Sequence, residues 1–257
     1  MDLVQTEIQN RVAYISLNRP EKRNALNPDL VKSLQESFLS QIQDDAVKVI
    51  VLRANGEVFS AGADLAYLQQ LQENSYEENV ADSTALKNLF YTIYSSPKVV
   101  IAQVEGHAIA GGCGLVSVCD IVFSVPEAKY AYTEVKIGFI PALVACFLVR
   151  KTGEARTREL LLSGDLIDAE TASNYGLINF IRDKHIIAEN VKNYAEKLSI
   201  EASAESISLT KRLINLAQNF TLEESLEQAI LLNATARASA DCKRGIAAFL
   251  NKEKIIW

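Results

Sequence analysis

The sequence predicts an α/β core followed by a purely helical region. Continuous apolar runs at residues 47–52 and 99–104 are typical of strands that are covered on both faces. Before the first of these runs, apolar residues recur at helical spacing over 30–42, which predicts a helix with one buried face. Toward the C-terminus only helical patterns remain. We therefore divide the chain into an α/β core at residues 1–190 and a helical region at 191–257.

Local signals predict the other elements in chain order. Residues 4–8 and 12–17 indicate two strands of a hairpin. Asn27 is suited to cap a helix that begins at Pro28 and runs to about residue 43. The polar and acidic segment 75–82 is predicted to be the most mobile part of the core. Further strands are expected at 121–125, 130–133 and 177–181, and further helices at 86–93, at 154–162, between Asp168 and Gly176, and after the capping box of Thr221 and Glu224.

Composition excludes several classes of partner. The 257 residues include 32 acidic and 26 basic side chains, for a net charge of −6, and no basic stripe is present. We therefore expect no nucleic-acid partner, although backbone amides and a few lysines can still bind a small anion. No apolar run approaches the roughly 20 residues of a membrane span, and no basic segment followed by an apolar one begins the chain. A cytoplasmic location without membrane contact is predicted.

The cysteines do not predict a metal or disulfide framework. Cys113, Cys119, Cys146 and Cys242 lie in apolar or helical contexts and form no C-x-x-C pair. We expect four reduced, buried thiols. With only two histidines in the chain, no metal site is expected.

Two small-residue turns occupy matching positions in the core. Gly111-Gly112 follows the apolar run 99–104, and Ala61-Gly62-Ala63 follows the run 47–52; each precedes a helical pattern. One backbone amide from each, converging on one oxygen, would form an oxyanion hole. Alternatively, both are tight turns in which glycine relieves crowding. A dinucleotide fingerprint is broken at Ser117, and no G-x-S-x-G element supports that serine as a nucleophile.

Glu134 is the carboxylate best placed for acid–base chemistry. It follows the extended run 130–133 and precedes the apolar segment that begins at Val135. Burial among apolar residues would raise its pKa toward the range of a useful proton carrier. The alternative is a structural glutamate paired with Lys136 or with a backbone amide.

Short motifs recur in a fixed order along essentially the whole chain. They are Arg19-Pro20, Asn24-Ala25-Leu26, Phe59-Ser60-Ala61-Gly62-Ala63-Asp64-Leu65, Gly106, Ala110-Gly111-Gly112-Cys113, Cys119-Asp120, Glu134, Gly138, Pro141, Gly176-Leu177, Gly245 and Phe249. In this order they resemble the crotonase (enoyl-CoA hydratase/isomerase) superfamily. This resemblance implies a spiral of ββα units, a helical C-terminal region at 191–257 that builds trimers or hexamers, and binding of acyl-CoA thioesters without a further cofactor.

The resemblance assigns roles residue by residue. It implies that the amides of Ala63 and Gly111 hold the thioester oxygen as an enolate, with Glu134 as the acid/base. Such amide donors act most strongly on charge that exists mainly in the transition state. Coenzyme A would be bound by Ala25, Ala61, Asp64 and Leu65, with the backbone around the first three at its adenine end. Phe249 and Lys252, from the same chain or a neighbouring subunit, would lie near the nucleotide.

One position departs from the family's common pattern. Typical hydratases carry a second glutamate where this chain has Gly114. In having a single glutamate, this chain resembles some enoyl-CoA isomerases of the family. The stretches 111–115 and 134–142, however, are similar to bacterial methylglutaconyl-CoA hydratases, in which glycine is usual there and whose substrate carries its own carboxylate. We favour this hydratase reading over the isomerase, and over a non-catalytic member that binds acyl-CoA or serves as a scaffold.

Overall fold

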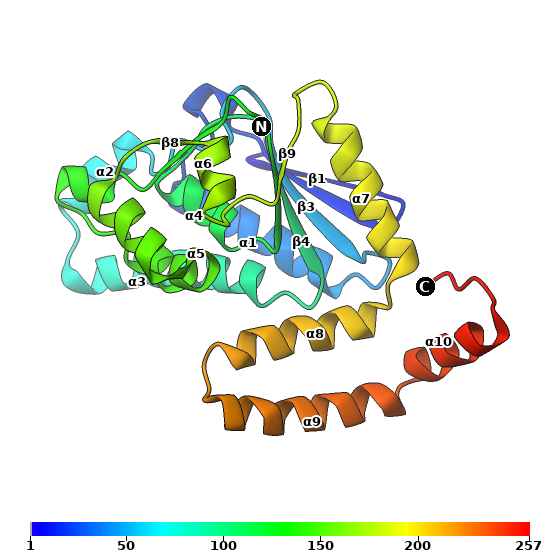
Figure 1. The fold of residues 1–257 in the computed structure, drawn as a ribbon. Helices are drawn as coiled ribbons and strands as arrows, with labels where there is room; N and C mark the ends of the chain where they lie inside the picture. Colours follow the sequence, from blue (N-terminus) through cyan, green and yellow to red (C-terminus); the bar gives the residue numbers. More distant parts are fainter. Residues whose placement is uncertain (1) are drawn as a thin grey trace.

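The computed structural model describes residues 2–257, and a six-stranded sheet forms its centre (Figure 1). The strands lie in the order β1-β2-β3-β4-β6-β9, and every neighbouring pair is parallel except the β1–β2 hairpin. Their bounds are β1 (Val4–Gln9), β2 (Val12–Leu17), β3 (Val49–Ala54), β4 (Val99–Val104), β6 (Ile121–Ser124) and β9 (Phe180–Ile181).

The sheet bears out the predictions made from the apolar runs. Every residue of β2 and β4 is buried, as are the first four residues of β3. Strand β1 lies at the edge and is mostly exposed. Asn10 and Arg11 turn the hairpin with φ of +50° and +67°, which gives the tight connection that the two strands need. The expected strand 177–181 is shorter than predicted, because only its last two residues pair with β6.

A second sheet has three strands, and residues of the predicted site follow two of them. It has the order β5-β7-β8, with β5 parallel to β7 and β8 antiparallel to β7. The strands are β5 (Ala108–Ile109), β7 (Lys129–Ala131) and β8 (Ile167–Asp168). Because β4 leads directly into β5, the chain passes from one sheet to the other just before the Gly111-Gly112 turn.

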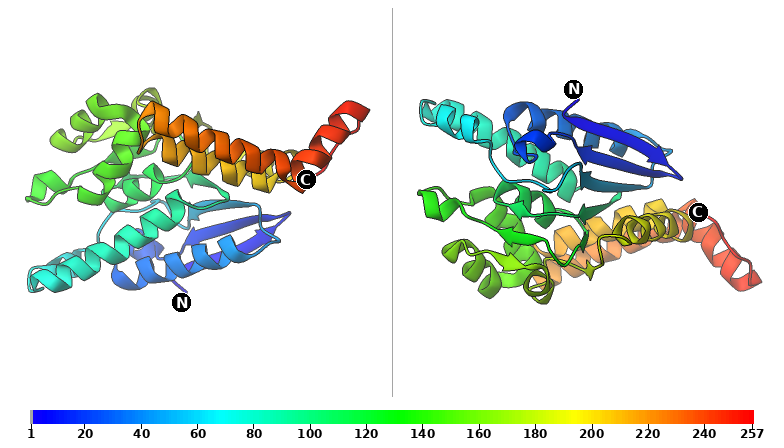
Figure 2. Two further views of the ribbon diagram at one scale, coloured as in Figure 1. Left: turned by 90° about the horizontal axis from the view of Figure 1, so that it is seen from below. Right: turned by 90° about the horizontal axis from the view of Figure 1, so that it is seen from above.

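Helices cover the large sheet on both sides (Figure 2). Helix α1 packs against β1, β2 and α3, and α7 packs against β2, β3, β4 and β6. The predicted cap of α1 is confirmed, since the Asn27 side chain accepts a hydrogen bond from the Leu30 amide. The helices of the core are α1 (Pro28–Gln43), α2 (Leu65–Leu71), α3 (Tyr76–Tyr94), α4 (Gly111–Ser117), α5 (Ala142–Ser163), α6 (Ala169–Asn174) and α7 (Ile187–Glu201), with short 3-10 turns η1 (Pro20–Lys22) and η2 (Glu134–Ile137).

Two helix predictions need correction. The helix predicted at 86–93 begins earlier, at Tyr76, because Ser75 and Glu78 form a capping box and segment 75–82 supplies the cap and first turns of α3. The helix predicted at 154–162 is the second half of α5, which continues across a kink where Gly153 has φ of +76°. The cap of α6 is as predicted, because Asp168 accepts a hydrogen bond from the Thr171 amide. No helix formed by residues 2–257 has the length and apolar character needed to cross a bilayer.

The C-terminal helices extend away from the sheets (Figures 1 and 2). The boundary placed between residues 190 and 191 falls inside α7, whose Val191 and Ala195 are fully buried in the core. Beyond it, α8 packs on α9, and α10 packs on both. Large apolar side chains on these helices are exposed, among them Leu222, Ile230, Leu231, Phe249 and Leu250. The remaining bounds are α8 (Ala204–Ala217), α9 (Leu222–Ala238) and α10 (Ala240–Asn251).

The cysteines match the expectation only in part. All four thiols are free, and Cys113 and Cys119 are buried, where burial raises the pKa of each to about 12 and keeps it protonated. Cys146 is exposed and Cys242 is partly exposed, so the prediction of four buried thiols is wrong for these two. Helical context alone does not decide which face of a helix a cysteine occupies.

Candidate active site

The two small-residue turns lie against each other. Ser60 pairs with Ala108 as an isolated parallel bridge, in which the Ser60 amide donates to the His107 carbonyl at 3.2 Å and the Ile109 amide donates to the Ser60 carbonyl at 2.9 Å. A second bridge joins Leu26 to Ala63. The turn before α2 and the turn before α4 are thereby connected through backbone hydrogen bonds.

Glycine is required where these turns touch. A Cβ atom at Gly62, which has φ of +88°, would lie 2.8 Å from the Cβ of Ala110. A Cβ atom at Gly112 would lie 2.5 Å from the Ser60 carbonyl oxygen. Real Cβ atoms do not approach backbone so closely, so the contact between the turns depends on the two missing side chains.

Two backbone amides at this junction have no hydrogen-bond acceptor. The Leu26 amide donates to the Gly62 carbonyl, and the Leu26 carbonyl accepts from the Asp64 amide. The amide of Ala63, which lies between Gly62 and Asp64, therefore points away from Leu26. Gly111 is the first residue of α4, where amides have no partner within the helix. Within residues 2–257, neither amide donates a hydrogen bond. Ala63 is exposed and Gly111 half-buried, so both are open to a ligand.

Ala110 holds the start of α4 in an unusual conformation. Its φ of 48° and ψ of −123° are strained for a residue with a side chain. Its own amide donates to the Ala131 carbonyl at 2.7 Å, which ties the residue to β7. Such strain costs on the order of 1–3 kcal/mol and persists only where the surrounding structure enforces it.

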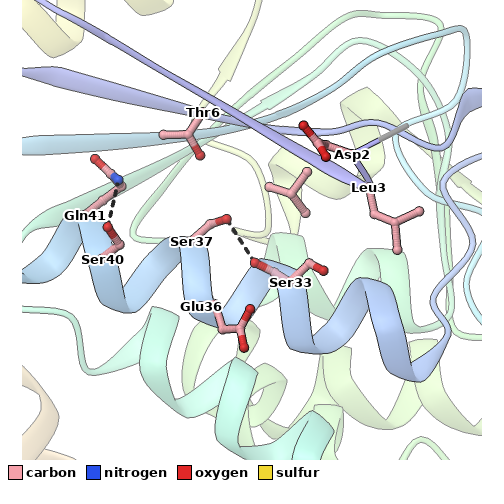
Figure 3. A pocket seen from close by; sticks show the side chains of 9 residues that line it. Asp2, Leu3, Thr6, Ser33, Glu36, Ser37, Ser40 and Gln41 are labelled. Atoms are coloured by element: carbon pink, nitrogen blue, oxygen red, sulfur yellow. Dashed lines mark hydrogen bonds between the residues drawn. The ribbon is translucent and has the colours of Figure 1, made fainter.

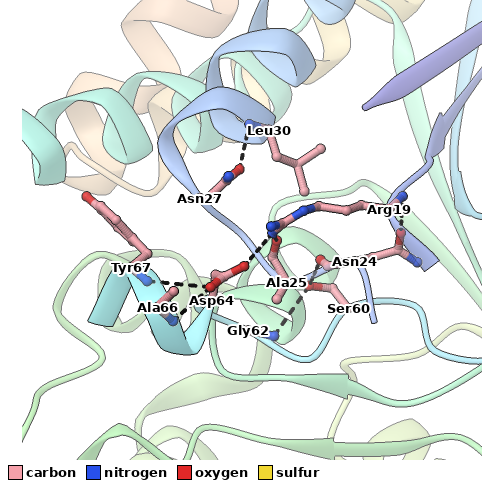
Figure 4. A network of polar contacts seen from close by, with 10 residues as sticks. All are labelled: Arg19, Asn24, Ala25, Asn27, Leu30, Ser60, Gly62, Asp64, Ala66 and Tyr67. Carbon is pink, nitrogen blue, oxygen red and sulfur yellow. Dashed lines mark hydrogen bonds and ion pairs between the residues drawn. The ribbon is translucent and has the colours of Figure 1, made fainter. Parts of the chain in front are cut away.

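A buried polar network fixes the loop that precedes α1 (Figure 4). The Asn24 side chain donates to the carbonyls of Asn55 and Val58, both at 2.9 Å, and accepts from the Arg19 amide at 2.8 Å. The Ser60 hydroxyl donates to the Asn24 carbonyl at 2.8 Å. Because Asn24 and Ser60 are fully buried, each of these bonds replaces water that neither group can reach.

Arg19 joins Ala25 and Asp64 across the same loop (Figure 4). Its Nη1 atom lies 2.6 Å from Asp64 Oδ2 and donates to the Ala25 carbonyl at 3.1 Å. Asp64 also caps α2 by accepting from the amides of Ala66 and Tyr67. Burial by itself would raise the pKa of Asp64, but these hydrogen bonds from Arg19 and the two amides together lower it. The carboxylate is thus occupied within the protein and leaves only backbone to a ligand.

Glu134 stands at the same edge as Gly111. Strands β5 and β7 are parallel with Ile109 opposite Ala131, so the residues just beyond them leave the small sheet in the same direction. Glu134 is partly buried, and its Oε2 atom is buried without a hydrogen-bond partner. Burial raises the pKa of this carboxyl group above its ordinary value. Its neighbour Lys136 pairs instead with Asp165 at 3.0 Å, which excludes the Lys136 pairing considered from the sequence.

The predicted coenzyme A residues fall into two groups. Ala25, Ala61 and Asp64 lie together, since the Ala61 amide donates to the Arg23 carbonyl and Arg19 bridges the other two. Leu65 follows them with its side chain exposed. Phe249 and Lys252 lie at the end of α10, on the opposite side of the molecule from α2 in both further views (Figure 2). Within one chain, the fold does not bring them to the other four.

A polar hollow between β1 and α1 lies elsewhere and contains none of the predicted site residues (Figure 3). Two of its hydroxyl groups bond within the protein: Ser37 donates to the Ser33 carbonyl at 2.9 Å, and Ser40 accepts from the Gln41 side chain at 3.4 Å. Among residues 2–257, no cluster of three or more histidine, cysteine, aspartate or glutamate side chains is arranged to hold a metal ion.

Sequence reasoning missed three kinds of residue in this site. The bridging role of Arg19 leaves no local sequence signal, because its partner Asp64 lies 45 positions away. The strained Ala110 carries no sequence signal, because alanine is not a residue that favours positive φ. Phe90 and Val144, which pack against Gly114, also carry none, since they occupy ordinary apolar positions of α3 and α5.

Two free amides and a partly buried glutamate whose Oε2 atom has no partner, on an α/β fold, are the features expected of the crotonase class. Comparisons with known proteins agree. The model of the enoyl-CoA hydratase/isomerase family matches residues 7–257, so the chain belongs to that family. Several relatives are named enoyl-CoA hydratases, which is consistent with an enzyme of the lyase class.

Three similar proteins illustrate the relationship. A provisionally named enoyl-CoA hydratase of Thermus thermophilus is 42% identical over 250 residues, covering 97% of this chain and 98% of the relative. The (E)-benzylidenesuccinyl-CoA hydratase of Thauera aromatica is 31% identical, covering 96% and 95%. A crystal structure from Legionella pneumophila, provisionally assigned as an enoyl-CoA hydratase/isomerase (crotonase), has a TM-score of 0.90 and 37% identity, covering 98% and 97%.

Proposed function

We propose that this enzyme adds water across the α,β double bond of an acyl-CoA thioester, with Glu134 as the acid/base and the amides of Ala63 and Gly111 as the oxyanion hole. The observation that carries the proposal is that the amides of Ala63 and Gly111 are unpaired and that the partly buried Glu134, whose Oε2 atom has no partner, leaves the small sheet at the same edge as Gly111. An amide pair suits an oxygen whose charge grows during reaction, and a carboxylate of raised pKa suits proton transfer near neutral pH.

The proposed reaction has two proton transfers through one group. The Glu134 carboxylate takes a proton from water as the water oxygen bonds to the β-carbon. The electrons of the double bond then form an enolate, whose oxygen the amides of Ala63 and Gly111 hold. When the enolate collapses, the α-carbon takes the proton from Glu134 and the carboxylate is regenerated. Water is thereby added with no net change in the enzyme.

For the acyl group we propose 3-methylglutaconyl-CoA. The support is the similarity of residues 111–115 and 134–142 to hydratases of that class, and the absence of a second carboxylate at Gly114. A relative named for a substituted succinyl-CoA thioester also points to acyl groups that bring their own carboxylate. Such a group could position the water that a second glutamate would otherwise hold.

A second candidate is a Δ3-Δ2 enoyl-CoA isomerase. One observation favours it: Glu134 is the only carboxylate proposed for the reaction, and one base is sufficient to move a proton between two carbons of an enolate. The two candidates share the same oxyanion hole and the same glutamate, and they differ in whether water enters the product.

The remaining site proposals concern the whole assembly. We propose that Ala25, Ala61, Asp64 and Leu65 bind coenzyme A, and that Phe249 and Lys252 complete this site from a neighbouring subunit of a trimer or hexamer. The exposed apolar residues of α9 and α10 supply a surface for such contacts. A monomeric mass in sedimentation equilibrium would contradict this assembly. No cofactor beyond the coenzyme A of the substrate is proposed, and the cytoplasmic location stays a prediction.

Product mass distinguishes the candidate reactions. The protein is incubated with 3-methylglutaconyl-CoA, crotonyl-CoA and a 3-enoyl-CoA, with butyryl-CoA as the saturated control. Gain of one water on the first substrate supports the proposal. Conversion of only the 3-enoyl thioester, at unchanged mass, would establish the isomerase instead. Butyryl-CoA should remain unchanged in every case, because it has no double bond to polarise.

The pH dependence follows from the raised pKa of Glu134. Burial favours the protonated carboxyl group, which cannot accept a proton from water. We therefore expect kcat/KM for hydration to fall as the pH is lowered, with the midpoint of this fall above about 4.3, the ordinary pKa of glutamate. A profile of kcat/KM from pH 4 to 9 in buffers of constant ionic strength measures this limb. An acid limb at or below the ordinary glutamate value would contradict the expectation.

A further inference from the structure

Apolar side chains of neighbouring helices close one wall of the proposed site next to Gly114. Position 114 is where the family resemblance places the second glutamate of typical hydratases, within one turn of Gly111 in α4. A side chain at position 114 would point toward Phe90 and Val144, whereas one at position 111 would point toward Leu26. Gly114 is buried, and its lack of a side chain leaves that direction to neighbouring helices.

Phe90 of α3 and Val144 of α5 fill this direction. A Cβ atom on Gly114 would lie 2.8 Å from Phe90 Cζ, 3.0 Å from Phe90 Cε2 and 2.9 Å from Val144 Cγ2. All three distances are shorter than ordinary van der Waals contact between carbons. The two side chains, which we term the Phe90–Val144 wedge, would therefore have to shift to admit even the first carbon of a side chain at this position.

The wedge is held firmly by its surroundings. Phe90 is fully buried and packs edge-on against Phe147 of α5, with ring centroids 6.3 Å apart and an interplanar angle of 80°. Val144 is also buried. A ring enclosed in this way cannot swing aside without leaving a void, because protein interiors are packed at close to crystal density.

We propose that Phe90 and Val144 are specificity-determining residues. They keep this wall of the site apolar, so that Glu134 is the only carboxylate available for the reaction. This inference rests on the proposed hydratase function. The consequence is a restriction on substrate: the chain hydrates enoyl thioesters for which one glutamate suffices and reacts poorly with straight-chain ones that need a second. Opening the wedge and adding a carboxylate at position 114 removes that restriction.

A set of matched variants tests the wedge. Phe90→Ala with Val144→Ala opens the space, and the same pair is combined with either Gly114→Glu or Gly114→Gln. The glutamate and glutamine versions have nearly the same shape and differ in the carboxylate. For each, kcat/KM is measured with crotonyl-CoA and with 3-methylglutaconyl-CoA. We expect the glutamate version to hydrate crotonyl-CoA at least about tenfold faster than the glutamine version, the low end for a positioned acid or base.

The outcomes separate this inference from the proposed function. If the wild-type protein hydrates 3-methylglutaconyl-CoA but the glutamate and glutamine versions do not differ on crotonyl-CoA, the inference is overturned and the function stands. A wild-type protein that hydrates crotonyl-CoA as well as 3-methylglutaconyl-CoA also overturns it. If the wild-type protein adds water to neither substrate, the proposed function fails and the inference fails with it.

A stability measurement covers the case in which the triple variants do not fold. Gly114→Ala is made in the wild type and in Phe90→Leu, with Leu89→Ala as a background of comparable burial on the same helix. We expect Gly114→Ala to lower the unfolding temperature of the wild type by about 3 °C or more, as overpacking of a core of this size does. In Phe90→Leu the loss should be at most half as large, and in Leu89→Ala it should be undiminished. An equal loss in all three backgrounds shows that Phe90 does not fill the position.

Discussion

Glu134→Gln is expected to lower kcat for hydration by about 10²- to 10⁴-fold while leaving thioester binding intact. The amide side chain has the shape of the carboxylate but cannot take a proton from water. Stopped-flow or steady-state absorbance of the enoyl thioester at saturating substrate measures kcat, and equilibrium titration with a saturated acyl-CoA measures binding. A variant that retains more than a tenth of wild-type kcat would exclude Glu134 as the proton carrier.

The same substitution carries a stability signature with a defined sign. Because burial raises the pKa of Glu134, the folded protein holds this proton more tightly than the unfolded chain does. The contribution of Glu134 to stability is therefore fully present below the unfolded-state pKa and is lost as the pH rises through the raised folded-state value. Glu134→Gln should thus gain stability relative to the wild type between acidic and neutral pH. Asp165→Asn, which breaks only the exposed pair with Lys136, is the control and should change neither kcat nor this pH trend.

Gly111→Pro is expected to lower kcat by about 10²- to 10³-fold, the loss typical of removing one donor from an oxyanion hole. Gly111 is the first residue of α4, and proline is accepted there because its fixed φ suits a helix start. The substitution therefore removes the amide hydrogen proposed to hold the enolate while α4 still forms. Turnover with the preferred enoyl thioester measures the loss, and thermal unfolding verifies the fold.

Gly111→Ala is the matched control for that experiment. It adds a Cβ atom 3.0 Å from Leu26 Cδ1, the end of a flexible side chain, but keeps the amide hydrogen. We expect its kcat to stay within about tenfold of the wild type, since only the crowding is shared with the proline variant. Equal losses in both variants would mean that crowding against Leu26, and not the missing donor, explains the proline effect.

The helix caps were predictable because each depends on residues three or four positions apart. Asn27 and Asp168 cap their helices as expected, and Thr221 with Glu224 forms its capping box. The start of α3 was predictable by the same rule, because Ser75 and Glu78 have the spacing of a capping box. The acidic composition of segment 75–82 conceals this start, because the segment lacks the apolar periodicity that marks the rest of α3.

The buried strands were predictable for a different reason. A strand covered on both faces needs apolar side chains at every position, and β4 shows that pattern over its whole length. The shortness of β9 was not predictable, since its extent depends on how far β6 runs alongside it. Strand length is set by the partner as much as by the strand's own residues.

The sequence suggested the chemistry of the site, because small-residue turns after buried strands and a glutamate beside apolar residues can be recognised without a structure. Its geometry was decided by tertiary structure. The contact of Gly62 with Ala110, the ion pair of Arg19 with Asp64 and the wedge of Phe90 at Gly114 each join residues more than twenty positions apart. The sequence by itself determined where helices begin and which strands are buried, since those depend on local hydrogen bonds and apolar periodicity. Which residues meet in the site was decided by the register of the two sheets and by the packing of the helices on the large sheet and on one another.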